Sequence, residues 1–110
     1  MTLVYKIMTA DEWRAAVAKG RFEGSAVDLT DGYIHLSTAE QAQETASKHF
    51  RGQADLVLVT LDVDTLAPVK WEPSRGGALF PHLYGPLDTA LALAVKPLPL
   101  NPDGAPETGL

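Results

Sequence analysis

The sequence predicts an α+β domain with a mainly antiparallel sheet and two helices, both in the N-terminal half of the chain. The first observation is the order of the apolar patterns, which reads β-α-β-α-β-β-β and favours this class over a doubly wound parallel sheet. The second is size and composition. The 110 residues are 45% hydrophobic and 21% charged, which suits one globular core.

The N-terminal segment predicts a strand that leads directly into a helix. The apolar, β-prone run Leu3–Met8 is followed by Thr9, which stands three residues before Glu12 in the spacing of a capping box. We therefore expect a helix over Ala10–Lys19, and Gly20 directly after it is a typical C-terminal stop.

The middle of the chain predicts a loop, a short strand and a second helix. The mixed segment Arg21–Gly32 is interpreted as an irregular crossing loop, and Tyr33–Leu36 as a strand. Either Ser37 or Thr38 caps the next helix, because a Glu or Gln stands three residues beyond each of them. This helix is expected to continue to about Phe50.

The C-terminal half predicts strands and then an unstructured end. The β-branched and aliphatic run Asp55–Val63 is expected to be a central strand. The segment Lys70–Gly77 is expected to be a loop or hairpin edge because it contains Pro and a Gly pair. Two further strands are expected over Phe80–Tyr84 and Leu91–Leu98. Residues 1–98 thus form the single domain, and residues 99–110, rich in Pro and Gly, are predicted to be a mobile tail.

Charge and cysteine content restrict the function classes. The net charge is -5 and the pI is near 5.0, which is unlike the basic surface of a DNA-binding protein. The absence of cysteine excludes disulfides, thiolate catalysis and Cys-ligated metals, and it fits a reducing compartment. No apolar stretch approaches the eighteen or so residues that cross a bilayer. We expect a cytoplasmic monomer with a small-molecule partner.

A polar pair marks the end of the second strand. Within a strand, His35 and Ser37 point to one face while Ile34 and Leu36 point to the other. The following helix start, with Thr38, offers unpaired N–H groups that favour an anion such as phosphate. Two plainer interpretations remain open. The ring of His35 would bond a backbone carbonyl, and the two hydroxyl residues would only cap the helix.

The second half of the chain supplies further polar candidates. Glu72 and Arg75 lie in the predicted loop, as a functional pair or as a surface ion pair of little energetic value. His82 and Tyr84 project to one side of a short strand and together would bind a ligand or transfer protons. A metal site of His35, His82 and Glu72 has no supporting ligand spacing, so no metal is expected.

Five segments in this order resemble the small bacterial proteins of domain-of-unknown-function family 952. The segments are DGYIHLSTAEQ, ETASKHF, DLVLVTLDV, VKWEPSRGG and FPHLYGPL. This family is remotely similar to the ADP-ribosyltransferase superfamily. Its first half resembles the NAD-dependent RNA 2'-phosphotransferases, in which H-L-S on a strand precedes a helix, as His35 to Ser37 do here. The resemblance implies a split antiparallel sheet that holds NAD in a cleft.

The resemblance also implies a function and a set of site residues. The expected function is NAD or nucleotide binding, with transfer or cleavage at the nicotinamide–ribose bond through an oxocarbenium-like state. The alternative is a non-catalytic module that binds a small anion or metabolite. The cofactor-binding candidates are His35, Ser37, Thr38, Arg75, His82, Tyr84 and Tyr5. The catalytic candidates are Glu72 and His35.

Overall fold

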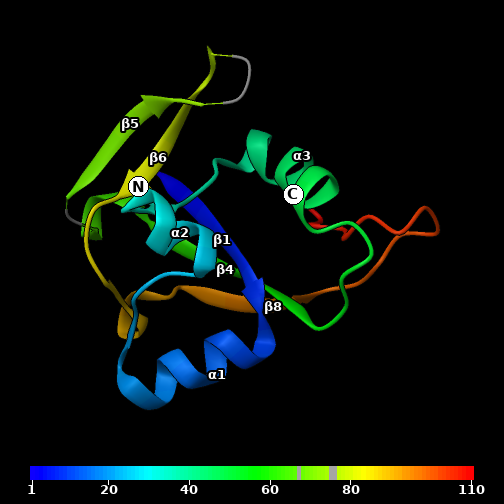
Figure 1. Ribbon diagram of the computed structural model, residues 1–110, viewed down its shortest axis with the longest axis horizontal. Helices are drawn as coiled ribbons and strands as arrows, with labels where there is room; N and C mark the ends of the chain where they lie inside the picture. Colours follow the sequence, from blue (N-terminus) through cyan, green and yellow to red (C-terminus); the bar gives the residue numbers. More distant parts are fainter. Residues whose placement is uncertain (67, 75–76) are drawn as a thin grey trace.

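The computed structural model describes residues 1–66, 68–74 and 77–110, and these residues confirm the predicted α+β class. Three α-helices and three antiparallel sheets are formed within this part of the chain (Figure 1). The helices are α1 (Ala10–Lys19), α2 (Ala26–Asp31) and α3 (Ala39–His49). The strands are β1 (Leu3–Thr9), β2 (Arg21–Phe22), β3 (Ile34–His35), β4 (Leu56–Asp62), β5 (Val69–Pro73), β6 (Leu79–Leu83), β7 (Leu87–Asp88) and β8 (Ala94–Leu98).

The strand that the sequence predicts to be central is β4, the middle strand of the sheet β1-β4-β8. Its partners on both sides are antiparallel, with Lys6 opposite Val59 and Leu58 opposite Lys96. The helices α1 and α3 cover opposite faces of this sheet (Figure 1). Ala16 of α1 packs with Met8 and Val59, whereas Ala46 of α3 packs with the other face. Residues that alternate along β1 therefore enter two separate cores.

The second three-stranded sheet has the order β3-β6-β5 and meets the first at one point. The backbone N–H of Tyr5 donates to the carbonyl of Ser37 at 2.8 Å, and the N–H of Ser37 donates back at 2.9 Å. The antiparallel sheet is thus split, as predicted, and Ser37, two residues after β3, joins its two parts. The short pair β2-β7 forms the third sheet. The hairpin of β5 and β6 projects from the body of the protein (Figure 1).

Side-chain caps fix where the first and third helices begin. The hydroxyl of Thr9 accepts a hydrogen bond from the N–H of Glu12 at 3.0 Å, and the Glu12 carboxylate accepts from the N–H of Thr9, which confirms the predicted capping box. For α3 the sequence leaves Ser37 and Thr38 as alternatives. The structure selects Thr38, whose hydroxyl accepts from the N–H of Gln41 at 3.3 Å.

One predicted irregular segment contains regular structure. The crossing loop Arg21–Gly32 includes β2 and the helix α2, so the described residues form three α-helices rather than the predicted two. The reason is a local cap, because the Asp28 carboxylate accepts a hydrogen bond from the N–H of Ser25 at 2.9 Å.

The segment Lys70–Gly77 is predicted from its sequence to be a loop or a hairpin edge, and its first four residues belong to β5, the edge strand of the β5–β6 hairpin. Pro73 at the end of β5 is compatible with an edge strand.

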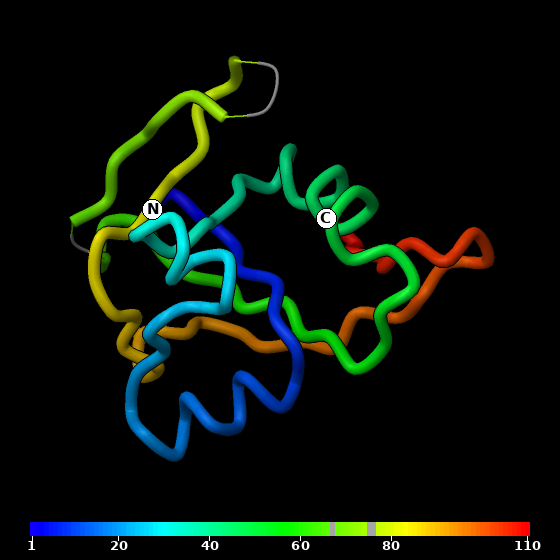
Figure 2. Tube along the Cα trace, viewed as in Figure 1, coloured from blue at the N-terminus to red at the C-terminus, as the bar shows by residue number. Residues whose placement is uncertain are grey.

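The last twelve residues, predicted to be a mobile tail, pack against α3 in the structure. Thr108 is buried, and its N–H and hydroxyl both donate to the side-chain oxygen of Gln43, at 3.0 and 3.1 Å. The amide nitrogen of Gln43 donates in turn to the carbonyl of Pro106 at 2.9 Å. The end of the chain therefore runs beside α3 (Figure 2). Among the described helices, none is long and apolar enough to cross a membrane.

We predict that Gln43→Ala destabilises the protein by about 1–3 kcal/mol, because it leaves the buried N–H and hydroxyl of Thr108 without their acceptor. Urea unfolding measures this free energy. Lys48→Ala on the same helix is the control, since Lys48 is exposed and forms only an ion pair with Glu44, worth under about 1 kcal/mol. Equal effects of the two substitutions would contradict a packed C-terminal segment.

Candidate functional site

A cavity of about 620 Å³ opens between β1, α2, the C-terminal half of α3, and β6. Its size is within the range of about 300–1,000 Å³ that is typical of small-molecule sites. The three histidines of the chain, His35, His49 and His82, all line it. Tyr5 and Ser37 line it as well, at the point where the two sheets meet. Four predicted cofactor-binding residues, Tyr5, His35, Ser37 and His82, are thus brought together.

A buried ion pair lies beside this cavity. The ammonium group of Lys6 on β1 is 2.9 Å from one carboxylate oxygen of Asp28 on α2 and 3.2 Å from the other. Only 5% of Lys6 and 1% of Asp28 is exposed. A buried charge is strongly unfavourable unless it is paired and hydrogen-bonded, so each of these two residues requires the other.

The Asp28 carboxylate also holds His35. It accepts a hydrogen bond from the backbone N–H of His35 at 3.1 Å and contacts the ring nitrogen Nδ1 at 2.6 Å. The other ring nitrogen, Nε2, lies 2.9 Å from a carboxylate oxygen of Asp31. An ionised carboxylate only accepts hydrogen bonds, so this geometry fits a ring with a hydrogen on both nitrogens. His35 bonds carboxylates rather than the backbone carbonyl of the plainer interpretation.

The environment of the ion pair moves the pKa of both partners. Burial by itself raises the pKa of Asp28, but the hydrogen bond with His35, the charge of Lys6 and the N–H of Ser25 outweigh it. The pKa of the Asp28 carboxyl is therefore well below its usual range. Burial lowers the pKa of the Lys6 ammonium group, and the Asp28 carboxylate opposes that change.

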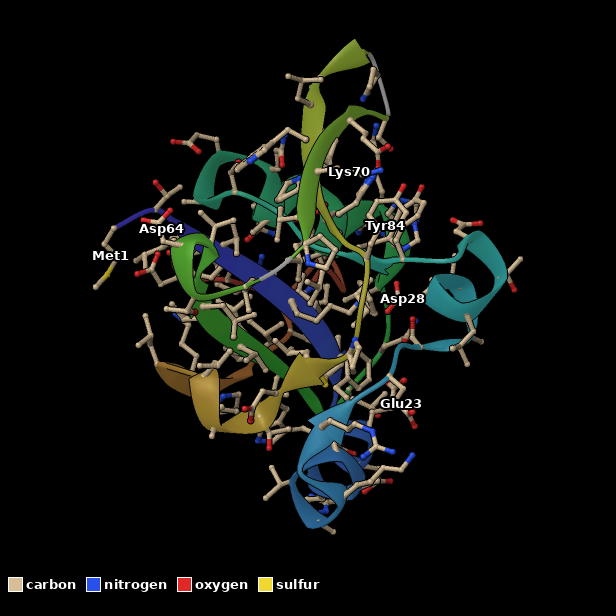
Figure 3. All side chains as sticks on the ribbon, turned by 90° about the vertical axis from the view of Figure 1, so that its left-hand side faces the viewer. Met1, Glu23, Asp28, Asp64, Lys70 and Tyr84 are labelled. Atoms are coloured by element: carbon tan, nitrogen blue, oxygen red, sulfur yellow. The ribbon has the colours of Figure 1, made fainter. Side chains whose placement is uncertain are left out.

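A second carboxylate cluster lies on the β5–β6 hairpin. One oxygen of Glu72 accepts a hydrogen bond from the hydroxyl of Tyr84 at 2.7 Å and lies 2.8 Å from Nδ1 of His82. The hydrogen bonds from Tyr84 and His82 lower the pKa of Glu72. The hydrogen bond between Tyr84 and Glu72 raises the pKa of Tyr84 to about 12. The ammonium group of Lys70 lies 4.9 Å from the centre of the Tyr84 ring, and Figure 3 shows the two residues side by side.

The ring of Tyr33 connects the two clusters. It stacks on His82 with the ring centres 4.0 Å apart and an angle of 25° between the planes. It is also tilted against His35 and Tyr84, at 4.7 and 5.2 Å. Burial, with the charges of nearby carboxylates, raises the pKa of the Tyr33 hydroxyl. The clusters therefore form one polar network, with Asp28 and Tyr84 on the same side of the protein (Figure 3).

Other predicted site residues lie apart from the cavity lining. Thr38 caps α3, which is the plainer of the two interpretations offered for it. Glu72 and Tyr84 are bound to each other outside the lining, and Glu72 also contacts His82, which lines the cavity. Arg75 lies outside the described residues. In the described part of the chain, no group of three or more His, Asp or Glu is arranged to hold a metal ion.

The site residues predicted from the sequence do not include Lys6, Asp28, Asp31 or Tyr33, which all belong to this network. A signal existed for two of them. Ser25 and Asp28 have the same spacing as the predicted capping box of Thr9, which indicates a helix start. Lys6 shares one face of a strand with the apolar residues Val4 and Met8 and therefore faces a core, where a lysine needs a carboxylate partner. Because Asp28 is far from Lys6 along the chain, the sequence does not identify it as the partner.

Comparisons with known proteins identify one family and closely similar solved structures. The sequence profile described as "Protein of unknown function (DUF952)" matches residues 7–95. The crystal structure of Protein CC0527 from Caulobacter crescentus is 59% identical, with a TM-score of 0.96, and the match covers 98% of this chain and 96% of that one. The solution NMR structure of CC0527 is also 59% identical, with a TM-score of 0.89 and coverage of 99% and 95%. No curated protein matches the chain.

We predict that Asp28→Asn destabilises the protein by about 3–5 kcal/mol, because it leaves the charge of Lys6 buried without a partner. Chemical denaturation near pH 7 measures the loss. The double variant Lys6→Met/Asp28→Asn is the control and should recover part of the stability, since it removes the isolated charge. A double variant less stable than Asp28→Asn would contradict this account of the pair.

The effect of Asp28→Asn should depend on pH. The pKa of Asp28 in the folded protein lies below the value of about 4 for an unfolded Asp. Its contribution to stability is therefore fully present above about pH 4 and is lost as the pH falls through the folded pKa. We expect the stability difference between wild type and Asp28→Asn to be large at pH 7 and to shrink below about pH 4. A difference that grows towards acid pH would contradict this prediction.

We predict that Glu72→Gln returns the pKa of Tyr84 from about 12 to near the ordinary value of about 10, because the carboxylate no longer stabilises the neutral phenol. Stability from this bond is fully present below about pH 10 and is lost as the pH rises through about 12. NMR titration of tyrosine labelled with ¹³C at the ring carbon that bears oxygen measures the pKa. Tyr84→Phe assigns the signal, and an unchanged pKa in Glu72→Gln would exclude this cause.

Proposed function

This chain belongs to the DUF952 family of proteins of unknown function. We propose that it binds NAD or a related nucleotide in the cavity between β1, α2, α3 and β6. The observation that carries the proposal is the convergence of four cofactor-binding candidates on this cavity. Tyr5, His35, Ser37 and His82 come from separate strands and the turn before α3, yet all line one space. The remote likeness to the ADP-ribosyltransferase superfamily supplies the ligand class.

The chemistry of the lining supports a nucleotide-sized ligand. The volume of about 620 Å³ accommodates a ligand with several polar groups. Aromatic and aliphatic surface from Phe80 and Ile7 lies beside the polar side chains of His35 and Ser37. Such a mixture suits a ligand with flat rings and with hydroxyl or phosphate groups, because the apolar wall takes the rings and the polar groups fix their orientation.

The proposed role of His35 is to hold a ribose or phosphate group. Its ring is kept in place by Asp28 and Asp31, and in the doubly protonated form it is a fixed positive charge at the edge of the cavity. The side chain of Asp31 is 40% exposed, so an incoming anionic group would replace it on Nε2 without breaking the buried contacts of Asp28. Anion binding would then replace the Asp31 carboxylate on Nε2 of His35 with a negatively charged group of the ligand.

A second candidate function is binding without catalysis, and the position of Glu72 favours it. In the ADP-ribosyl transfer that the likeness implies, a carboxylate would stabilise positive charge on the ribose as the glycosidic bond lengthens. The carboxylate of Glu72 is bound by His82 and Tyr84, and Glu72 is not among the residues that line the cavity. On this arrangement the chain would be a sensor or carrier of a nucleotide or a small anionic metabolite.

We predict that isothermal titration detects binding of NAD or ADP-ribose, and that His35→Gln weakens it by about tenfold or more, as expected for the loss of one hydrogen bond to a charged group. The matched control is Arg14→Gln, which removes a positive charge from the exposed face of α1 and should leave the affinity unchanged. The absence of binding heat with NAD, ADP-ribose and nicotinamide up to millimolar concentration would show that the protein does not bind this class of ligand.

A turnover assay separates the two functions. Incubation with NAD labelled in the nicotinamide ring, with and without cell extract, measures release of nicotinamide. Release that falls by about a hundredfold in Glu72→Gln, with little change in affinity, would make the protein a transferase or hydrolase that uses this carboxylate. Saturable binding without release would make it a binding module.

A further inference from the structure

We propose that His82 is the proton-accepting group of the cavity, and that Glu72 and Tyr33 are the residues that position it. The inference deepens the proposed function, on which it rests for the identity of the ligand. It assigns to the same cavity a specific preference for a ligand that presents a hydroxyl group, such as a ribose.

The backbone around His82 is fixed on both sides. β6 is the middle strand of its sheet, and His82 stands opposite His35 on β3 and Lys70 on β5. Residues directly opposite each other in antiparallel strands project to the same face, so His35 and His82 are neighbours. Their ring centres are 5.6 Å apart. His82 is only 3% exposed and lines the cavity.

Glu72 determines which nitrogen of His82 carries the hydrogen. Nδ1 of His82 is 2.8 Å from a carboxylate oxygen of Glu72, and an ionised carboxylate only accepts hydrogen bonds. The low pKa of Glu72 keeps that carboxylate ionised at neutral pH. In the neutral ring the hydrogen is therefore on Nδ1, and Nε2 presents a lone pair.

The lone pair on Nε2 reaches the cavity. Among the described residues, none forms a hydrogen bond with Nε2 of His82, whereas no fully enclosed side-chain nitrogen or oxygen of these residues lacks a partner. Nε2 is therefore in contact with accessible space, and the space that the ring lines is the cavity. An acceptor at such a position selects a ligand group that donates a hydrogen bond.

Two further contacts hold the ring in this orientation. Tyr33 stacks on the face of His82 at 4.0 Å, which opposes rotation of the ring. The hydroxyl of Tyr84 donates to the same oxygen of Glu72 at 2.7 Å, and this bond fixes the carboxylate. A side chain held by a second set of contacts keeps its geometry when a ligand enters.

The neighbouring histidine cannot take this role in the described arrangement. Both nitrogens of His35 lie against carboxylates, Nδ1 at 2.6 Å from Asp28 and Nε2 at 2.9 Å from Asp31. The two adjacent rings therefore offer opposite chemistry, a donor at His35 and an acceptor at His82. A sugar or phosphate with both a hydroxyl group and a negative charge matches this pair.

The proton transfer that follows is balanced within the site. A ligand O–H bond breaks as an Nε2–H bond forms, and the electron pair of the broken bond stays on the ligand oxygen, which becomes a stronger nucleophile. His82 becomes an imidazolium with its other hydrogen still on Nδ1, and the adjacent Glu72 carboxylate stabilises that charge. In a binding module the ligand hydroxyl would donate a hydrogen bond to Nε2 of His82, and no proton would be transferred.

The orientation of His82 can be tested without any ligand. We expect ¹⁵N NMR of the imidazole groups at about pH 8.5 to show hydrogen on Nδ1 and none on Nε2 in the wild type. Glu72→Ala should move hydrogen to Nε2, whereas Glu23→Ala, which removes an exposed carboxylate that pairs with Lys19, should keep the wild-type pattern. Hydrogen on Nε2 in the wild type would overturn the proposal, whether or not NAD binds.

The preference for a hydroxyl group is tested by paired titrations with ADP-ribose and its deoxyribose analogues. The wild type should bind ADP-ribose up to about tenfold more tightly than one of the analogues. His82→Asn places its amide near the position of Nδ1 and should abolish the preference for ADP-ribose over the analogue. His82→Gln places an acceptor near the position of Nε2 and should keep that preference. Melting temperatures of both variants confirm that they fold.

The outcomes separate the two proposals. If neither NAD nor ADP-ribose binds, the proposed function fails, and the NMR measurement alone decides whether His82 is an acceptor. If ADP-ribose binds with a ratio that His82→Asn leaves unchanged, the nucleotide function stands and the role of His82 is overturned. Loss of the ratio in His82→Asn and its return in His82→Gln would establish the role.

Discussion

The buried ion pair of Lys6 and Asp28 is the interaction on which the cavity depends. It connects the first strand of one sheet to α2, a helix of only six residues that would have little stability by itself. The same carboxylate caps α2 through Ser25 and holds the ring and backbone of His35. One buried group thus fixes a strand, a helix and a candidate ligand-binding side chain, so its loss would disturb all three together.

The split of the sheet explains why the polar groups face a shared space. The two three-stranded sheets meet through the backbone of Tyr5 and Ser37, and α2 and α3 lie on either side of the junction. A continuous sheet would cover this point with side chains of neighbouring strands. Because the strands separate instead, His35 and His82 reach one cavity from adjacent strands of the second sheet.

The two carboxylate–imidazole couples give the cavity its chemical asymmetry. Asp28 and Asp31 occupy both nitrogens of His35, whereas Glu72 occupies only Nδ1 of His82. The ring of Tyr33 contacts both imidazole rings and connects the two couples. Two chemically identical side chains are thereby given different hydrogen-bonding roles, because their neighbours and not their own structure determine where the hydrogens are.

Patterns of a few residues predict the local features of this protein, and the tertiary structure brings these features together. The patterns narrow the start of α3 to Ser37 or Thr38, and the central strand β4, the cap at Thr9 and the shared face of His35 and Ser37 follow from them directly. The partner of Lys6, the meeting of Glu72 with His82 and the packing of residues 99–110 on α3 do not. These contacts join residues 22, 10 and up to 65 positions apart, and the register of paired strands and the docking of helices create them. Periodicity and capping act within one turn or one strand, so they carry no information about such pairings.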